Sequence, residues 1–156
     1  MNVNDYLIDH SDFAWSDLLD DWRWLLAAPP TVWLCNRFAE LVLVMQDGTI
    51  SYLETSAGAL KKLAASRQDF IVKLDQGDNA NEWLMIPLVD RCRAAGKMLG
   101  PNQCYGFTTP PVLGGAYELP NIEVTDLTVY LAVMGQIHRQ IKDVPDGTKI
   151  RMVVGP

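Results

Sequence analysis

The fold is decided by the stretch from Gly100 to Gly147, which reads GPNQCYGFTTPPVLGGAYELPNIEVTDLTVYLAVMGQIHRQIKDVPDG. The first part of this stretch predicts a loop. Proline disfavours the helical region for the residue before it, so Thr109–Pro110–Pro111 should be extended. Gly114–Gly115 permits positive φ and therefore a turn. After Pro120 the chain should be extended again, as a short strand over residues 121–125.

The remainder of the stretch has the clearest helical pattern in the sequence. Apolar side chains and one histidine recur at i, i+3 and i+4: Leu127, Tyr130, Leu131, Met134, Ile137, His138 and Ile141. This spacing predicts an amphipathic helix, with Thr125 or Asp126 as its N-cap and with Pro145–Asp146–Gly147 ending it. Residues 127–133 also fit a strand, so both alternatives stand for the first half. Residues 149–154 alternate like a final strand.

Upstream of this stretch, the strongest strand signal is a hairpin. Residues 40–45 and 49–54 are rich in apolar and β-branched side chains, and Asp47–Gly48 lies between them. Two such runs joined through Asp-Gly predict two antiparallel strands with a tight turn. Residues 31–34 should form a further extended segment, because they follow Pro29–Pro30.

Helices are predicted on both sides of the hairpin. Residues 4–28 should form short helices, with Ser11–Asp12 and Ser16–Asp17 as N-cap candidates. A second helix should open at Ser56 and carry apolar residues as far as Phe70. A third should begin at Pro87, which fits a first-turn position, and end near Ala95.

These patterns predict an α+β fold, a single compact domain over residues 1–156 with an antiparallel or mixed sheet and four to five helices. The predicted strands lie near residues 32–35, 40–45, 49–54, 104–107, 121–125 and 149–154. We see no internal repeat or low-complexity linker, and the length fits one hydrophobic core.

Composition limits the classes of function. A hydrophobic content of 49% argues against disorder. The sequence contains neither an apolar run long enough to span a membrane nor a secretory signal, which indicates a cytoplasmic protein. Cys35, Cys92 and Cys104 are scattered and fit packed, reduced thiols. A net charge of −6 would repel nucleic acid phosphates and attract basic protein partners.

No residue pattern indicates an active site. A Cys–His hydrolase needs a nucleophile, a base and an orienting group that meet in space. Cys104, His138 and Asp143 supply the residue types, but their spacing does not predict a meeting. The sequence has no zinc, P-loop, dinucleotide or nucleophile-elbow motif. Residues 75–82 are acidic, yet they lack the register of a calcium loop. We therefore predict no catalytic residue, no metal and no cofactor.

Several segments together resemble a known bacterial family. They are Cys104–Phe107, Pro110–Gly115 and Gln136–Asp143 before Pro145–Thr148, with further likeness at Asp5–Ile8, Asn36–Phe38 and Asn79–Arg91. The family resembled over these segments is domain of unknown function 1851, also described as the C-terminal domain of type VI secretion immunity proteins. The Pro-Pro-x-Leu-Gly-Gly and Ile-His-x-Gln pieces are distinctive together, and neither is a catalytic signature.

The resemblance implies a protein that protects a bacterium from a toxin. The best-understood relatives neutralise DNase toxins delivered between competing bacteria, and in them this domain usually follows a GAD-like domain, for which this chain has no room. We therefore expect a non-enzymatic immunity protein that binds and neutralises a cognate toxin, a basic nuclease. The acidity of the chain agrees with this, because a nuclease is usually basic where it holds phosphate.

Two groups of acids beside tryptophans are the candidate toxin-binding residues, chosen by charge and aromatic anchoring. The N-terminal acidic cluster consists of Asp17, Asp20, Asp21 and Trp24, and the central acidic cluster consists of Asp75, Asp78, Glu82 and Trp83. Of the other tryptophans, Trp22 is expected in the core, because it lies on an apolar stripe. Trp15, Trp24 and Trp33 fit either the core or a surface.

Two further classes of function stay open. The first is a small ligand-binding or enzymatic domain whose site lies at the proline–glycine loop. Its candidate residues are Tyr105, Pro110, Pro111, Gly114, Gly115 and His138. The second is a self-associating structural module with exposed tryptophans in a two-fold interface. The sequence does not determine the oligomeric state.

Overall fold

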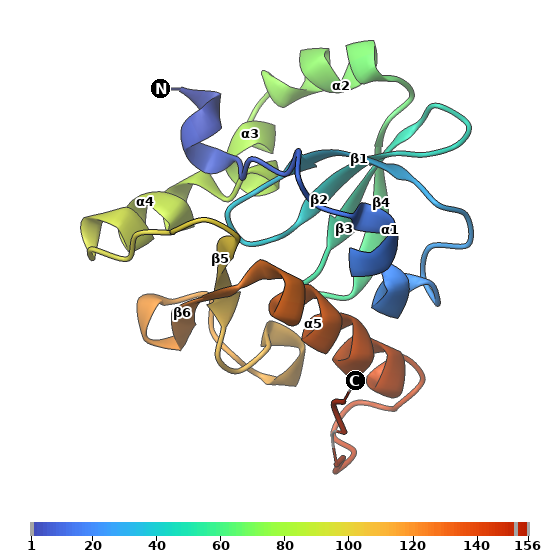
Figure 1. Ribbon diagram of the computed structural model, residues 1–156, viewed down its shortest axis with the longest axis vertical. Helices are drawn as coiled ribbons and strands as arrows, with labels where there is room; N and C mark the ends of the chain where they lie inside the picture. Colours follow the sequence, from blue (N-terminus) through green and yellow to red (C-terminus); the bar gives the residue numbers. More distant parts are fainter. Residues whose placement is uncertain (1, 152, 156) are drawn as a thin grey trace.

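The computed structural model describes residues 2–151 and 153–155, and it confirms an α+β fold (Figure 1). The 3-10 helices (η), α-helices and strands follow one another as η1 (Val3–Tyr6), α1 (Trp15–Leu18), η2 (Asp20–Trp22), β1 (Thr31–Cys35), β2 (Leu41–Val44), β3 (Ile50–Glu54), β4 (Ala59–Ala64), α2 (Arg67–Leu74), α3 (Asn79–Trp83), α4 (Ile86–Ala94), β5 (Gln103–Phe107), η3 (Pro111–Leu113), η4 (Leu119–Asn121), β6 (Ile122–Asp126) and α5 (Leu127–Ile141). In the described ranges, no helix is long and apolar enough to cross a membrane.

The main sheet is an antiparallel meander in the order β1-β2-β3-β4. The predicted hairpin forms its centre, where Val44 pairs with Ile50. Gly48 has a φ of 85° in the turn, a conformation that costs glycine little. The Asp47 carboxylate accepts hydrogen bonds from both the backbone and the hydroxyl of Thr49. The Asp-Gly signal is therefore confirmed, together with the reason for it.

The helix predicted to open at Ser56 is wrong in its first half. The chain turns at Gly58, and the residues that follow pair with β3 as β4. Helix α2 begins only at Arg67, where the Ser66 hydroxyl accepts from the Asp69 amide at 3.1 Å. If this segment were helical, β3 would be an edge strand with unpaired backbone groups. Pairing those groups with β4 outweighs the helix propensity of the segment. Lys61 and Lys62 suit the new edge strand, because charge discourages edge-to-edge pairing.

The two faces of the main sheet are covered by different helices, because alternate strand residues point to opposite faces. On one face, Leu41 and Leu43 of β2 belong to a core with η2 and α5. On the other face, Val42 of β2 and Tyr52 of β3 belong to a core with α2 and α3. The sheet is thus the middle layer between the N-terminal and C-terminal helices on one side and the central helices on the other.

The smaller sheet, β5 paired antiparallel with β6, lies outside the meander. Its apolar residues form a third core with α4, centred on Phe38, Tyr105 and Phe107. Helix α4 has Pro87 in its first turn, as predicted. Cys35, Cys92 and Cys104 are free and buried, which confirms the prediction of packed thiols.

Helix α5 links the N-terminal part of the molecule to its C-terminal part. It is helical throughout Leu127–Ile141, so the helix prediction is confirmed and the strand alternative is wrong. Asp126 is the N-cap, and its carboxylate accepts from the Val129 amide at 2.9 Å. Trp22 is fully buried against α5, and its indole N–H donates to the Leu131 carbonyl at 2.9 Å. This bond ties the beginning of the chain to its last helix.

Two local predictions near the ends are wrong. Helix α1 begins after Ala14 without a side-chain cap, so neither Ser11 nor Ser16 caps it; Ser11 is instead held by the Asp9 carboxylate. The predicted final strand is absent from the described residues 149–151 and 153–154, while Met152 lies outside them. The tail finds its hydrogen-bond partners on a helix instead of on a strand.

Candidate partner-binding surface

The N-terminal acidic cluster lies on α1 and η2, with Asp17 and Asp20 exposed. Asp20 is paired with Arg23 at 2.8 Å. Trp24 is half-buried, because its indole N–H donates to the Gly135 carbonyl at 3.2 Å and its ring stacks on Trp22. The cluster therefore offers exposed carboxylates, while its tryptophan is held against α5.

The central acidic cluster lies at the end of α2 and along α3, with Asp75, Asp78 and Glu82 exposed. Trp83 is only 9% exposed, and its ring stacks on Phe70 with centroids 5.3 Å apart. This tryptophan is a core residue that positions α3 over the sheet. The exposed part of the cluster is consequently acidic without its predicted aromatic anchor.

The structure does not bring the two acidic clusters together. The N-terminal cluster lies over the sheet face that carries Leu41 and Leu43, and the central cluster lies over the opposite face. One flat interface therefore cannot use both.

A cavity of about 350 Å³ opens beside the central cluster. We call it the Glu40 pocket. Its wall combines carboxylates, hydroxyls and aromatic rings from β3, β4, α3 and the loops, including the residue before β2: Glu40, Tyr52, Glu54, Ser56, Lys61, Leu63, Glu82, Trp83, Met85 and Tyr117. Two predicted binding residues, Glu82 and Trp83, meet the charged groups Glu40, Glu54 and Lys61 in this cavity.

Glu40 is the buried acid of this pocket, only 4% exposed. Its carboxylate accepts a hydrogen bond from the Tyr52 hydroxyl at 2.7 Å and another from the Ser56 hydroxyl. Asn36 in turn donates to the Tyr52 oxygen at 3.2 Å. Burial raises the pKa of Glu40, because desolvation disfavours the charged form, although the two hydroxyls oppose the shift. Burial and the neighbouring Glu40 likewise raise the pKa of Tyr52.

The charges on the pocket wall are unbalanced. Lys61 pairs with Glu54, and this hydrogen bond raises the pKa of the Lys61 ammonium. Within the described part of the chain, no basic side chain forms an ion pair with Glu40 or Glu82. Tyr117 lies at the rim with 46% of its surface exposed. Carboxylates beside an aromatic face are suited to a cationic side chain.

Sequence reasoning predicted only Glu82 and Trp83 of this pocket, and Glu40 and Tyr117 are the most informative of the residues that it missed. The sequence does carry a signal for Glu40, because this residue directly precedes the apolar run Leu41–Val44. A carboxylate in that position lies either in solvent or at the edge of the core. Tyr117 carries no such signal, because its place follows from the proline–glycine loop folding back beside Phe107.

The alternative site at the loop is assembled only in part. A cavity of about 360 Å³ is lined by His138, by Val112 and Leu113 of η3, and by residues of the segment after α5. Tyr105 does not reach it; this side chain is buried in the third core, where its hydroxyl donates to the Lys97 carbonyl. The loop thus approaches His138 through η3 and without Tyr105.

The loop itself is a structured turn. Asn121 holds it by accepting from the Thr109 amide at 2.8 Å and donating to the Thr109 and Ala116 carbonyls. Gly114 has a φ of 95°, as the sequence predicts. Gly115 is needed for a different reason, because a Cβ there would lie 1.8 Å from the Thr109 carbonyl oxygen.

His138 is held as a neutral ring. Its Nε2 lies 2.8 Å from the Thr55 carbonyl, which can only accept, so Nε2 carries the proton. Burial lowers the pKa of His138. The backbone of Gly58 packs against the ring, since a Cβ there would lie 2.4 Å from Nδ1. Cys104, the thiol considered with it, is fully buried, and burial raises its pKa. Neither group has the environment of an activated nucleophile or base.

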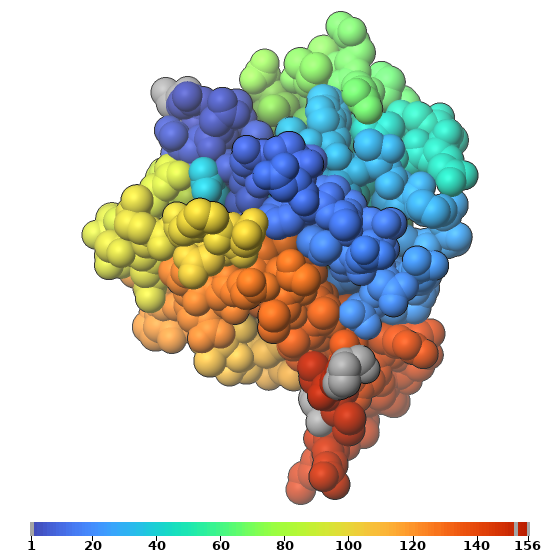
Figure 2. Space-filling view, viewed as in Figure 1, coloured from blue at the N-terminus to red at the C-terminus, as the bar shows by residue number. Residues whose placement is uncertain are grey.

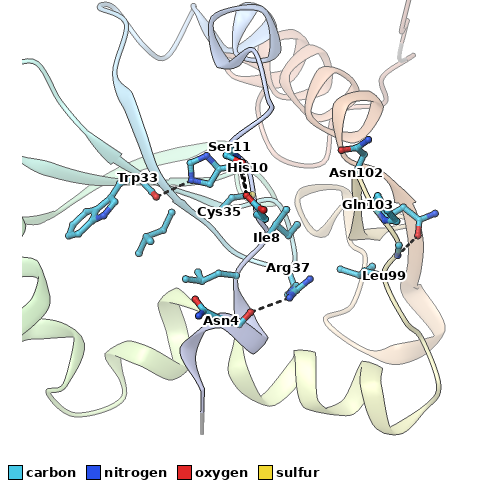
Figure 3. Close-up of a pocket in the computed structure, with 15 residues that line it drawn as sticks. Asn4, Ile8, His10, Ser11, Trp33, Cys35, Arg37, Leu99, Asn102 and Gln103 are labelled. Atoms are coloured by element: carbon cyan, nitrogen blue, oxygen red, sulfur yellow. Dashed lines mark hydrogen bonds between the residues drawn. The ribbon is translucent and has the colours of Figure 1, made fainter.

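The largest cavity, of about 720 Å³, lies between the N-terminal segment and the loop before β5 (Figure 3). Its histidine and arginine already have partners. Both ring nitrogens of His10 are used, one with the Trp33 carbonyl and one with the Trp15 indole N–H, each at 3.0 Å. Arg37 donates to the carbonyls of Asn4 and Asp5. The hydrogen bonds around this cavity therefore anchor the N-terminal segment to β1 and to the loop that follows it.

The site thus combines partnered histidines, buried thiols and an acidic pocket at the surface. Among the residues that the structure describes, no group of His, Cys, Asp or Glu could hold a metal ion. Residues 64–138, from the last residue of β4 into α5, match a family model described as T6SS immunity protein Tdi1, C-terminal. The match covers slightly less than half of the chain and confirms its resemblance to type VI secretion immunity proteins. Neither the curated proteins nor the solved structures gave a match.

Proposed function

We propose that this protein is a cytoplasmic immunity protein that neutralises a cognate toxin by binding it, without catalysis, and that the toxin is a basic nuclease. The observation that carries the proposal is the family match over residues 64–138. The net charge of −6 supports a basic partner, because complementary charge accelerates association.

The Glu40 pocket and the exposed acids of the central cluster are the surface that we assign to the toxin. The exposed acids of the central cluster and Tyr117 lie within the matched segment, whereas Glu40 and the sheet wall of the pocket, like the N-terminal cluster, lie outside it. A lysine or arginine of the toxin would enter beside Glu82, which forms no ion pair with the described residues, with the Tyr117 ring against its cation. Asp20 of the N-terminal cluster, by contrast, already has a cationic partner in Arg23.

Three matched charge reversals test this assignment. Glu82→Lys alters the central cluster, Asp17→Lys alters the N-terminal cluster, and Glu123→Lys alters an exposed residue of β6 as a control. The toxin is first identified by co-purification with the products of neighbouring genes. We expect Glu82→Lys to slow association about tenfold at low salt, because steering is lost, and the other two variants to bind as the wild type does.

Surface plasmon resonance measures the association rates, and a nuclease assay measures whether the bound toxin is inactive. Equal slowing by Glu82→Lys and Glu123→Lys would show that only the overall charge acts. Slowing by Asp17→Lys alone would move the interface to the opposite face of the sheet. A partner that stays active while bound would contradict the immunity role.

A further inference from the structure

The tail of the chain is held on α5 by two glutamine side chains. Gln136 accepts from the Gly155 amide and donates to the Gly155 carbonyl, each at 3.0 Å. Gln140 accepts from the Val153 amide at 3.1 Å and donates to the Val153 carbonyl. Figures 1 and 2 show the tail returning to the surface beside the C-terminal half of this helix.

This arrangement recognises main chain alone. Four helical residues rise about 6 Å, and two residues of an extended strand span about 6.6 Å. Glutamines at i and i+4 therefore match alternate residues of a strand, whose amide and carbonyl groups face the same side. Both primary amides are used fully, as donor and as acceptor, and neither contact depends on the identity of the tail side chain.

On α5, an apolar stripe lies next to the two glutamines, toward the helix N-terminus. The tail runs antiparallel to α5, because Val153 lies at Gln140 and Gly155 lies nearer the helix N-terminus at Gln136. Ahead of Gln136 on the same outer face come Val133, Ala132 and Val129, the last 57% exposed. A partner strand that continues beyond the two paired residues would cover this stripe.

We propose that the outer face of α5 is a docking site for an extended segment of a protein partner, apolar beyond the two residues that Gln136 and Gln140 pair with. In the free protein, Val153–Gly155 occupies the glutamine half of the site and is displaced by the incoming strand. When a protein binds an extended peptide segment, hydrogen bonds to the peptide main chain supply affinity, and pockets or apolar surface supply selectivity. This site lies apart from the Glu40 pocket and does not rest on the proposed function.

The test uses the full chain and a peptide probe. Val153→Pro with Gly155→Pro removes both tail N–H donors and so releases the glutamines. The probe is a synthetic peptide of the tail sequence, KIRMVVGP, with two leucines added at its C-terminus to reach the apolar stripe. Binding is followed by the NMR signals of the Gln136 and Gln140 side-chain amides and of the Val129 and Val133 methyl groups.

We expect the peptide to shift all four sets of signals, and to bind the released variant at least about threefold more tightly than the wild type, since the attached tail competes at millimolar effective concentration. Adding Gln136→Ala and Gln140→Ala should abolish the shifts, whereas Gln76→Ala, at an exposed glutamine in the turn between α2 and α3, should not. The absence of any shift at millimolar peptide would overturn the proposal. Shifts that persist without the two glutamines would do the same.

Discussion

At the scale of single residues, Glu40 is an acid whose ionisation is controlled by the fold. Its carboxylate is buried and hydrogen-bonded to Tyr52 and Ser56. Its pKa is raised above the ordinary value of 4.5, mainly by desolvation. The folded protein therefore binds this proton more tightly than the unfolded chain does. Between pH 4.5 and the raised pKa, this residue makes stability fall as pH rises.

Glu40→Gln should remove this pH dependence. We expect the free energy of unfolding of the wild type, relative to the variant, to increase as pH falls from about 8 to about 5, because the wild type gains a proton on folding. Urea denaturation of both proteins measures it. Glu123→Gln, at an exposed carboxyl, is the matched control. A constant difference between wild type and Glu40→Gln over this range would contradict the raised pKa.

Residue-level predictions succeeded where a pattern constrained the side chain. Trp22 lies on an apolar stripe, and its burial followed from that pattern. Trp83 sits among acids in the sequence, so local charge suggested a surface; its burial depends on Phe70 and on the sheet beneath it. The Glu40 pocket draws on the loop before β2, on β3, β4 and α3, and on the segment after η3, and no local signal could place these together.

At the scale of elements, the N-cap of α5 allows a direct test of one local interaction. Asp126→Ala removes the carboxylate that accepts from the Val129 amide, and should lower the free energy of unfolding by about 1 kcal/mol. Asp126→Asn keeps an accepting oxygen and should lose less than half as much. Thermal and urea denaturation compare the three proteins. Equal losses in both variants would assign the effect to the charge near the helix terminus instead of to the cap.

The elements that were predicted well are those with local codes. The hairpin has its Asp-Gly turn, α5 has long apolar periodicity, and α4 has its first-turn proline. The errors at β4 and at the C-terminal tail share a physical cause. Each segment takes its hydrogen-bond partners from a distant element, β3 for the first and α5 for the second. Their sequences permit helix or strand, and tertiary pairing decides between them.

At the scale of the whole molecule, the sheet separates the two acidic clusters, and this limits how a single toxin can dock. Hydrogen exchange of the toxin complex should show protection on α3 and around Tyr117, with α1 and η2 unchanged, because the sheet and its two cores lie between these surfaces. The free protein is the reference. Equal protection of α1 and α3 in a complex of one toxin with one immunity protein would contradict a single interface.

The bond from Trp22 to Leu131 also has a consequence for biosynthesis. It joins residues 109 positions apart, so the core around Trp22 cannot close until most of the chain has left the ribosome. At about 5–20 residues per second, that interval is roughly 5 to 22 s. During it, the growing chain must carry Trp22 and its apolar neighbours without their final cover. Burial of Trp22 is therefore completed only after α5 has been made.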